Sequence, residues 1–114
     1  MIKKDPLIFI KHMLESIKEL EDFSTDLTKE ELSKNKLYQN AILRSIEVLG
    51  EAAKNIPKDF VSKYPEIRWK DIVGTRDKLI HHYFGIDWNT ILGIIENEIP
   101  ILKRQLKKIL NEIK

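Results

Sequence analysis

The residues best suited to chemistry lie between positions 75 and 87, where Arg76, Asp77, His81 and Tyr83 follow one another closely. Histidine titrates near neutrality and can transfer protons. Arginine is a fixed, forked cation that binds phosphate oxygens and stabilises charge that develops in a transition state. The chemistry that these residue types suggest is cleavage of a phosphodiester. No metal ion is needed for RNA, because the 2′-hydroxyl can act as the nucleophile.

Helical geometry decides which of these side chains can meet. At about 100° per residue, Arg76 and Tyr83 lie near the middle of an apolar stripe, whereas His81 lies roughly 140° from Arg76. Asp77 precedes His81 by four residues, a spacing at which helical side chains meet, so Asp77 can fix the histidine tautomer. His82 lies on another flank and is assigned no role. Arg76 and His81 converge only if the arginine reaches round, the helix distorts, or a second copy supplies one of them.

An ordinary structural interpretation stays open for the same residues. An arginine on an apolar stripe can bury its aliphatic stem and keep its charged end in water. A histidine near a helix end can simply interact favourably with the helix dipole. Spacing alone favours this structural interpretation over the catalytic one.

The rest of the chain is predicted to form the helices that position this stretch. Apolar periodicity and cap signals predict helices over about 6–23, 28–35, 36–55 and 58–63, a further helix that carries residues 76–83 after a lead-in turn from Trp69, and a last helix from 87 to the C-terminus. The expected fold is all-α: an up-and-down bundle of four main helices with short connecting helices, in a single domain spanning residues 1–114. The start signals are Asp5-Pro6 and a capping box at 28–31.

Two glycines and one proline carry specific expectations. Gly50 lies inside the long third helix, where it costs about 1 kcal/mol relative to alanine, so another helix is expected to approach closely there. Gly74 is expected to divide its segment into a lead-in turn and the helix that carries Arg76. Pro100 is expected to kink the last helix, because it removes a backbone hydrogen bond.

Composition narrows the class of protein. Hydrophobic content of 42% and charged content of 33% indicate a soluble globular protein, and the absence of cysteine excludes disulfides and cysteine-based metal sites. The three histidines lack zinc-site spacing. No segment approaches the roughly 20 apolar residues of a membrane span, and no signal peptide is visible, so we expect a cytoplasmic protein. The basic run Lys103, Arg104, Lys107 and Lys108 is interpreted as a solvated helix face.

The pattern Arg76-x4-His81-x-Tyr83, continuing to Asp87, is similar to the signature of the HepT-like branch of the HEPN superfamily. Two further segments resemble that family: Arg44-x2-Glu47-x2-Gly50-Glu51-Ala52-Ala53 and Tyr64-Pro65-Glu66-Ile67-x-Trp69. The resemblance covers nearly the whole chain. One difference is Asp77, a position at which many relatives carry asparagine.

The resemblance implies a metal-independent ribonuclease without a cofactor, the toxin of a HepT/MntA-type (type VII) toxin–antitoxin system. Arg76 and His81 would be catalytic, with Asp77 and Tyr83 in supporting roles. An MntA-like nucleotidyltransferase antitoxin would be the partner and would neutralise the toxin by transferring AMP from ATP to Tyr83. The substrate would be RNA.

Further expectations concern the surroundings of this motif. By the resemblance, Arg44, Glu47 and Glu51 form a polar wall of the cleft, whereas their spacing alone would equally fit a surface salt-bridge ladder. A symmetric homodimer is expected, because a two-fold axis near the apolar stripe would bring both motifs into one cleft. Two alternatives stay open: a non-catalytic, nucleotide-binding dimer that partners a nucleotidyltransferase, and a purely structural helical dimer.

Overall fold

The computed structural model describes residues 5–25, 27–81 and 85–113, and the side chains of Ile80 and His81 also lie outside this description. All regular structure in these ranges is helical, which confirms the predicted all-α class. The elements are α1 (Pro6–Ser24), α2 (Lys29–Lys34), α3 (Lys36–Asn55), α4 (Lys58–Val61), α5 (Trp69–His81), α6 (Trp88–Gly93), the π-helical segment η2 (Ile94–Glu98) and α7 (Ile99–Ile113). None of the described helices is long and apolar enough to cross a membrane.

Side-chain caps begin the helices at the predicted places. The Asp5 carboxylate accepts a hydrogen bond from the Leu7 N–H at 3.0 Å, directly before Pro6 at the start of α1. The Thr28 hydroxyl accepts from the Glu31 N–H at 3.1 Å, as the capping box predicts. These bonds satisfy amide groups that a helix N-terminus otherwise leaves without a partner.

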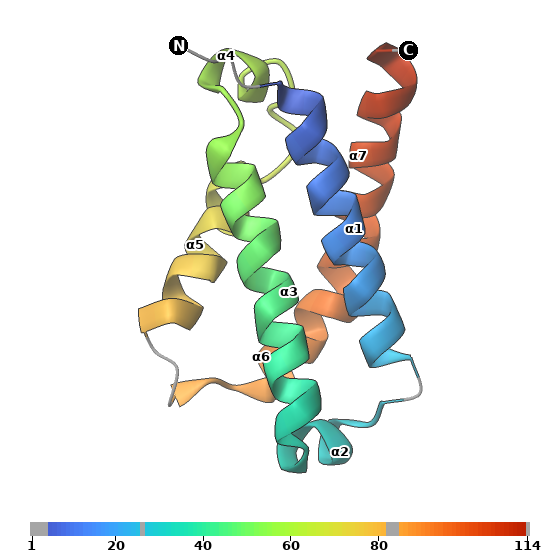
Figure 1. Cartoon of the computed structure of the whole chain (residues 1–114), viewed down its shortest axis with the longest axis vertical. Coiled ribbons are helices and arrows are strands. Elements are labelled where there is room, and N and C mark those ends of the chain that lie inside the picture. The colour runs from blue at the N-terminus through green and yellow to red at the C-terminus, as the bar shows by residue number, and fades with distance from the viewer. Residues whose placement is uncertain (1–4, 26, 82–84, 114) are drawn as a thin grey trace.

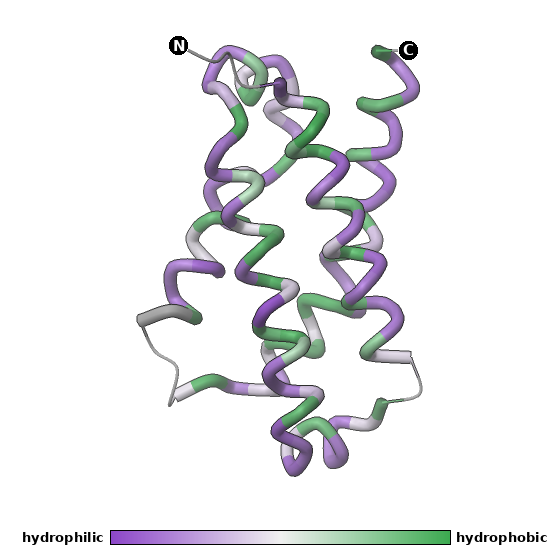
Figure 2. The backbone as a smooth tube through the Cα atoms, in the orientation of Figure 1, coloured by the Kyte–Doolittle hydropathy of each residue, from purple (hydrophilic) through white to green (hydrophobic). Residues whose placement is uncertain are grey.

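The long helices form a bundle in which α1 packs on both α3 and α7, while α5 runs along α3 in the opposite direction (Figure 1). The short helices α2 and α6 lie at one end of α3. Hydrophobic and hydrophilic residues alternate along each helix, so each one has an apolar face (Figure 2). On α1 that face is completely buried at Ile10, Met13, Ile17 and Leu20. Burial of amphipathic faces therefore holds the bundle together.

The chain bends before Pro100, as predicted, and the structure shows how. The Ile99 N–H donates to the Ile94 carbonyl, five residues back, which is the hydrogen bond of a π-helix. This turn of wider helix precedes the proline, which has no N–H to donate. The segment from α6 through η2 to α7 consequently changes direction while remaining helical (Figure 1).

The expectation for Gly74 was wrong, because α5 runs without interruption from Trp69 to His81. The start of this helix is held by the Trp69 indole, whose Nε1–H donates to the Tyr64 carbonyl at 3.0 Å. Its side packs along α3. An interior glycine costs only about 1 kcal/mol, and these tertiary contacts outweigh that cost.

The basic run on α7 is a solvated face at three of its four positions. Arg104, Lys107 and Lys108 are exposed, as predicted. Lys103 differs, because its Nζ donates to both carboxylate oxygens of Glu21 at 3.0 and 3.1 Å. This ion pair connects α7 to α1.

Candidate functional site

The site begins with the close approach of α5 to α3 at Gly50. A methyl group in place of the Gly50 hydrogen would lie 2.8 Å from Cγ of Arg76 and still closer to its Cβ. The Ile72 carbonyl oxygen would lie 3.3 Å away. The prediction of a close helix approach at Gly50 is therefore confirmed, and the structure identifies the aliphatic stem of Arg76 as what fills the space.

The guanidinium of Arg76 is only partly hydrated. Its side chain is 23% exposed, and Nη1 donates to Oδ1 of Asp77 at 2.9 Å. Nε is buried and has no hydrogen-bond partner among the described residues. A buried donor without a partner destabilises a fold by about 1–3 kcal/mol. Such exceptions concentrate at functional sites, so this geometry favours a role for Arg76 beyond stability.

The other motif residues are placed less completely. Asp77 is half-exposed and binds Arg76, so the carboxylate partly neutralises the cation that the sequence assigned to phosphate. His81 is the last described residue of α5, and its side chain lies outside the description. His82 and Tyr83 lie outside the described residues altogether. An interaction between Asp77 and His81 therefore stays a prediction.

The three polar residues of α3 occupy different surroundings. Glu47 precedes Gly50 by three residues, which places both on the same face of α3. Because α5 runs antiparallel to α3 (Figure 1), the last turn of α5 lies beside the part of α3 that precedes Gly50. Arg44 and Glu51 are exposed and Glu47 is half-buried. Within the described residues these three side chains form no ion pairs with one another, which does not support the salt-bridge ladder.

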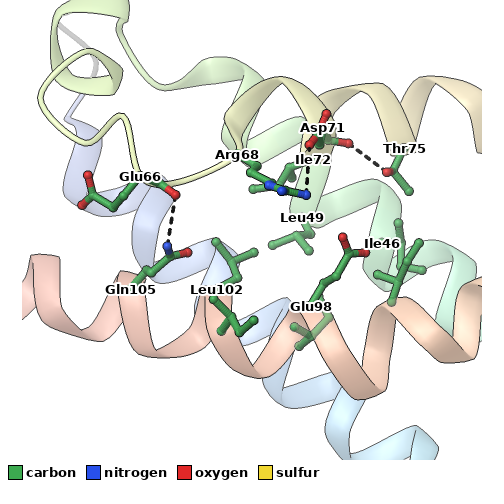
Figure 3. A pocket seen from close by; sticks show the side chains of 13 residues that line it. Ile46, Leu49, Glu66, Arg68, Asp71, Ile72, Thr75, Glu98, Leu102 and Gln105 are labelled. Carbon is green, nitrogen blue, oxygen red and sulfur yellow. Dashed lines mark hydrogen bonds and ion pairs between the residues drawn. The ribbon is translucent and has the colours of Figure 1, made fainter.

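A separate groove lies between α5 and α7, and Arg76 does not line it (Figure 3). Its volume is about 340 Å³, and its floor includes Ile46 and Leu49 of α3. Polar side chains surround this floor: Glu66, Arg68, Asp71, Thr75, Glu98 and Gln105. Gln105 Nε2 donates to the Glu66 carbonyl at 3.2 Å and so connects α7 to the loop before α5. Sequence reasoning did not find this groove, because residues far apart in the chain form it.

No group of three or more histidine, aspartate or glutamate side chains in the described ranges is arranged to hold a metal ion. The chemistry that the described residues offer is that of a partly dehydrated cation on α5, followed five residues later by a histidine. Together with an all-α bundle, these features define a helical domain with an arginine–histidine motif on its third long helix.

Comparison with known proteins identifies the family. The family model described as "Ribonuclease HepT-like" matches residues 13–109, and the chain belongs to this family. It is 45% identical over 113 residues to "Putative RNase MJ0127" of Methanocaldococcus jannaschii, covering 99% of this chain and 93% of that protein. It is also 40% identical to "Putative RNase TTE0752" of Caldanaerobacter subterraneus, covering 97% of this chain and 99% of that one.

A third relative carries the family name itself. "Probable ribonuclease HepT" of Thermococcus cleftensis is 36% identical over 108 residues, covering 95% of this chain and 98% of that protein. No solved structure matches the chain. The resemblance inferred from the motif and its flanking segments is thus confirmed at the level of the family.

Proposed function

We propose that this protein is a metal-independent endoribonuclease in which Arg76 and His81 carry the reaction. The observation that carries the proposal is the placement of Arg76: its stem is packed on Gly50, its Nε is buried, and its Nη1 pairs with the half-exposed Asp77. Relatives across nearly the full length of the chain are named as ribonucleases, which supports the same activity.

The reaction uses the nucleophile that RNA already contains. His81 accepts the proton of the 2′-hydroxyl, and the resulting oxygen attacks the adjacent phosphorus. The bond from phosphorus to the 5′-oxygen breaks, and that oxygen takes up a proton as it leaves. The products are a 2′,3′-cyclic phosphate and a free 5′-hydroxyl. Arg76 binds the non-bridging oxygens, where its charge is more effective because the site is partly dehydrated.

Regulation in this proposal acts on the same cation. Two copies of the chain form a symmetric dimer, so that His81 of one protomer can approach Arg76 of the other. A nucleotidyltransferase antitoxin transfers AMP from ATP to the Tyr83 hydroxyl and releases pyrophosphate. The attached phosphate adds negative charge close to Arg76 in sequence and competes with RNA for it. The protein then acts as the toxin of a HepT/MntA-type pair.

The catalytic part is tested with purified protein, free of any antitoxin, on total RNA with and without EDTA. We expect cleavage in both conditions, 2′,3′-cyclic phosphate ends and no cleavage of DNA, which lacks the 2′-hydroxyl. His81→Ala should lower the rate by about 10²–10⁴-fold, the usual contribution of general acid–base catalysis. The neighbouring His82→Ala is the matched control and should retain most activity. Cleavage that EDTA abolishes would overturn the proposed mechanism.

The regulatory part is tested by intact-mass spectrometry after incubation with a cognate nucleotidyltransferase, ATP and magnesium. We expect the protein to gain mass in units of AMP, and Tyr83→Phe to gain none. Tyr38→Phe is the control, because Tyr38 is 39% exposed but lies outside the motif. Modification that persists in Tyr83→Phe would remove this switch.

A second function is favoured by one observation, the ion pair between Arg76 and Asp77. A cation that is already paired binds phosphate less strongly, which suits a dimeric module that holds a nucleotide and partners a nucleotidyltransferase without cleaving RNA. In the assay above, this module would leave RNA intact in both the wild type and His81→Ala.

A further inference from the structure

The four glycines of the chain differ in what surrounds them. At Gly74, Gly85 and Gly93, no atom of another part of the described chain lies within 4 Å of the position that a Cβ atom would take. At Gly50 that position is filled by atoms of α5. Gly50 is therefore the glycine whose missing side chain is required for space.

The atoms at this position belong mainly to Arg76. A methyl group at residue 50 would collide with Cβ and Cγ of Arg76. The backbone of α5 fixes the position of Cβ, so this atom cannot move unless α5 moves. The methyl group would also press on the Ile72 carbonyl oxygen at 3.3 Å, one helical turn earlier. The stem thus lies directly on the backbone of α3.

This contact determines where the charged end can lie. With the stem on α3, Nε is buried and has no hydrogen-bond partner within residues 5–25, 27–81 and 85–113, while Nη1 reaches Asp77. An arginine whose stem was free would turn Nε toward water or a carboxylate and remove that cost. Gly50 therefore allows the guanidinium to lie in a position that is unfavourable for the hydrogen bonding of Arg76.

We propose that Gly50 is the positioning residue for Arg76, acting by letting the arginine stem seat on α3. The effect on cleavage rests on the ribonuclease function proposed above, whereas the seating itself does not. A side chain at residue 50 would push α5 outward and move the guanidinium away from the phosphate. A displacement of about 1 Å at a reacting group can lower a rate by about 10²-fold.

The first test compares Gly50→Ala with Gly74→Ala. Both replace a helix-interior glycine, but only the first introduces a collision. We expect Gly74→Ala to keep full activity and an equal or higher Tm, because alanine favours helix. Gly50→Ala should keep its helical circular dichroism, lower kcat by about 10²-fold and change the KM for RNA much less. Equal activity of the two variants would overturn the proposal.

The second test measures coupling without requiring cleavage. Binding of a fluorescent 2′-O-methyl RNA, which cannot react, is measured for Gly50→Ala, Arg76→Gly and the double variant. We expect each single change to weaken binding, and Gly50→Ala to add little further once Arg76 is glycine, because glycine lacks both atoms with which the new methyl group collides. Additive losses would show that Gly50 acts through something other than Arg76 and would overturn the proposal.

The third test measures thermal stability, and it remains informative even if Gly50→Ala does not fold. Arg76→Gly removes both colliding atoms, so Gly50→Ala should lower Tm markedly in the wild type and much less in Arg76→Gly. If Gly50→Ala is unfolded, the double variant should fold again. Failure of the double variant to recover would contradict the seating. If wild-type protein cleaves no RNA but this coupling holds, the ribonuclease proposal fails while the positioning inference stands.

Discussion

Helix α5 has two sides that differ in how they are closed. Toward α3, the backbones approach until only a glycine fits, and the stem of Arg76 fills the contact. Toward α7, a groove of about 340 Å³ with a charged rim remains open (Figure 3). The motif residue lies on the closed side. Chemistry in this protein is therefore expected where a charge is dehydrated, and not simply where the surface is hollow.

Two arginines make this comparison concrete. Arg68, on the groove rim, has a side chain that is 78% exposed and an Nη1 atom 3.9 Å from Oδ2 of Asp71. Arg76, eight residues later, is 23% exposed and lies 2.9 Å from Asp77. Water screens the first cation far more than the second. A phosphate would gain more from Arg76 than from Arg68.

The largest effect should come from exchanging these arginines for alanine one at a time. Arg76→Ala should lower kcat/KM for RNA by at least about 10²-fold, because it removes the cation that stabilises the charged transition state. Arg68→Ala, which removes the same side chain from the groove rim, should keep activity within about twofold, because exposed charges contribute little. Initial rates on a defined RNA substrate measure both.

The opposite order of activities for these two variants would contradict the assignment of the active site to the α3 side of α5. If Arg68→Ala were the inactive variant and Arg76→Ala the active one, the groove would be the active site. Circular dichroism of both variants separates a loss of chemistry from a loss of fold.

A second prediction concerns stability on the two faces of α7. Leu106 is fully buried in the bundle, whereas Ile101 borders the groove and is 50% exposed. Leu106→Ala should lower the free energy of unfolding by about 2–5 kcal/mol, because it leaves a cavity in the core. Ile101→Ala should change it by roughly 0.5 kcal/mol or less. Urea unfolding measures both, and a large loss for Ile101→Ala would mean that the groove rim is buried in the protein in solution.

The sequence correctly predicted features that depend on local signals, such as the residues at which helices begin. Cap residues such as Asp5 and Thr28 bond to amides within three residues, so the helix starts could be inferred without the tertiary structure. Gly50 signalled a close contact because nothing local explains a glycine inside an amphipathic helix. The family of the protein was recognisable because the motif and the flanking segments match together over nearly the whole chain.

What could not be predicted depends on contacts between distant segments. Arg76 and Gly50 are 26 positions apart, and no local rule pairs them. Gly74 was misread because its weak helix-breaking tendency was judged without the packing of α5 on α3. A proline can be accommodated either by a break in the helix or by a π-helical turn before it. Which of the two occurs at η2 depends on how the last helix packs on the bundle, and local sequence does not show this.

The smallest effect should come from neutralising one carboxylate on each side of α5. Asp77→Asn keeps the size of the side chain and its oxygen acceptor but removes the charge that pairs with Arg76. Binding of 2′-O-methyl RNA should tighten by about two- to fivefold, since partly exposed ion pairs contribute roughly 0.2–1 kcal/mol. Asp71→Asn on the groove side, where the carboxylate is 71% exposed, should change binding less. Fluorescence anisotropy at fixed salt measures both.

The same variant decides what Asp77 does. If its main task is to restrain Arg76, Asp77→Asn binds RNA more tightly and its kcat is maintained or raised. If its main task is to orient His81, binding is unchanged and kcat falls, because asparagine no longer favours the charged form of the histidine. The 2.9 Å contact with Nη1 of Arg76 favours the first outcome. A fall in kcat with unchanged binding would show that this contact is secondary and that Asp77 belongs to the proton-transfer half of the site.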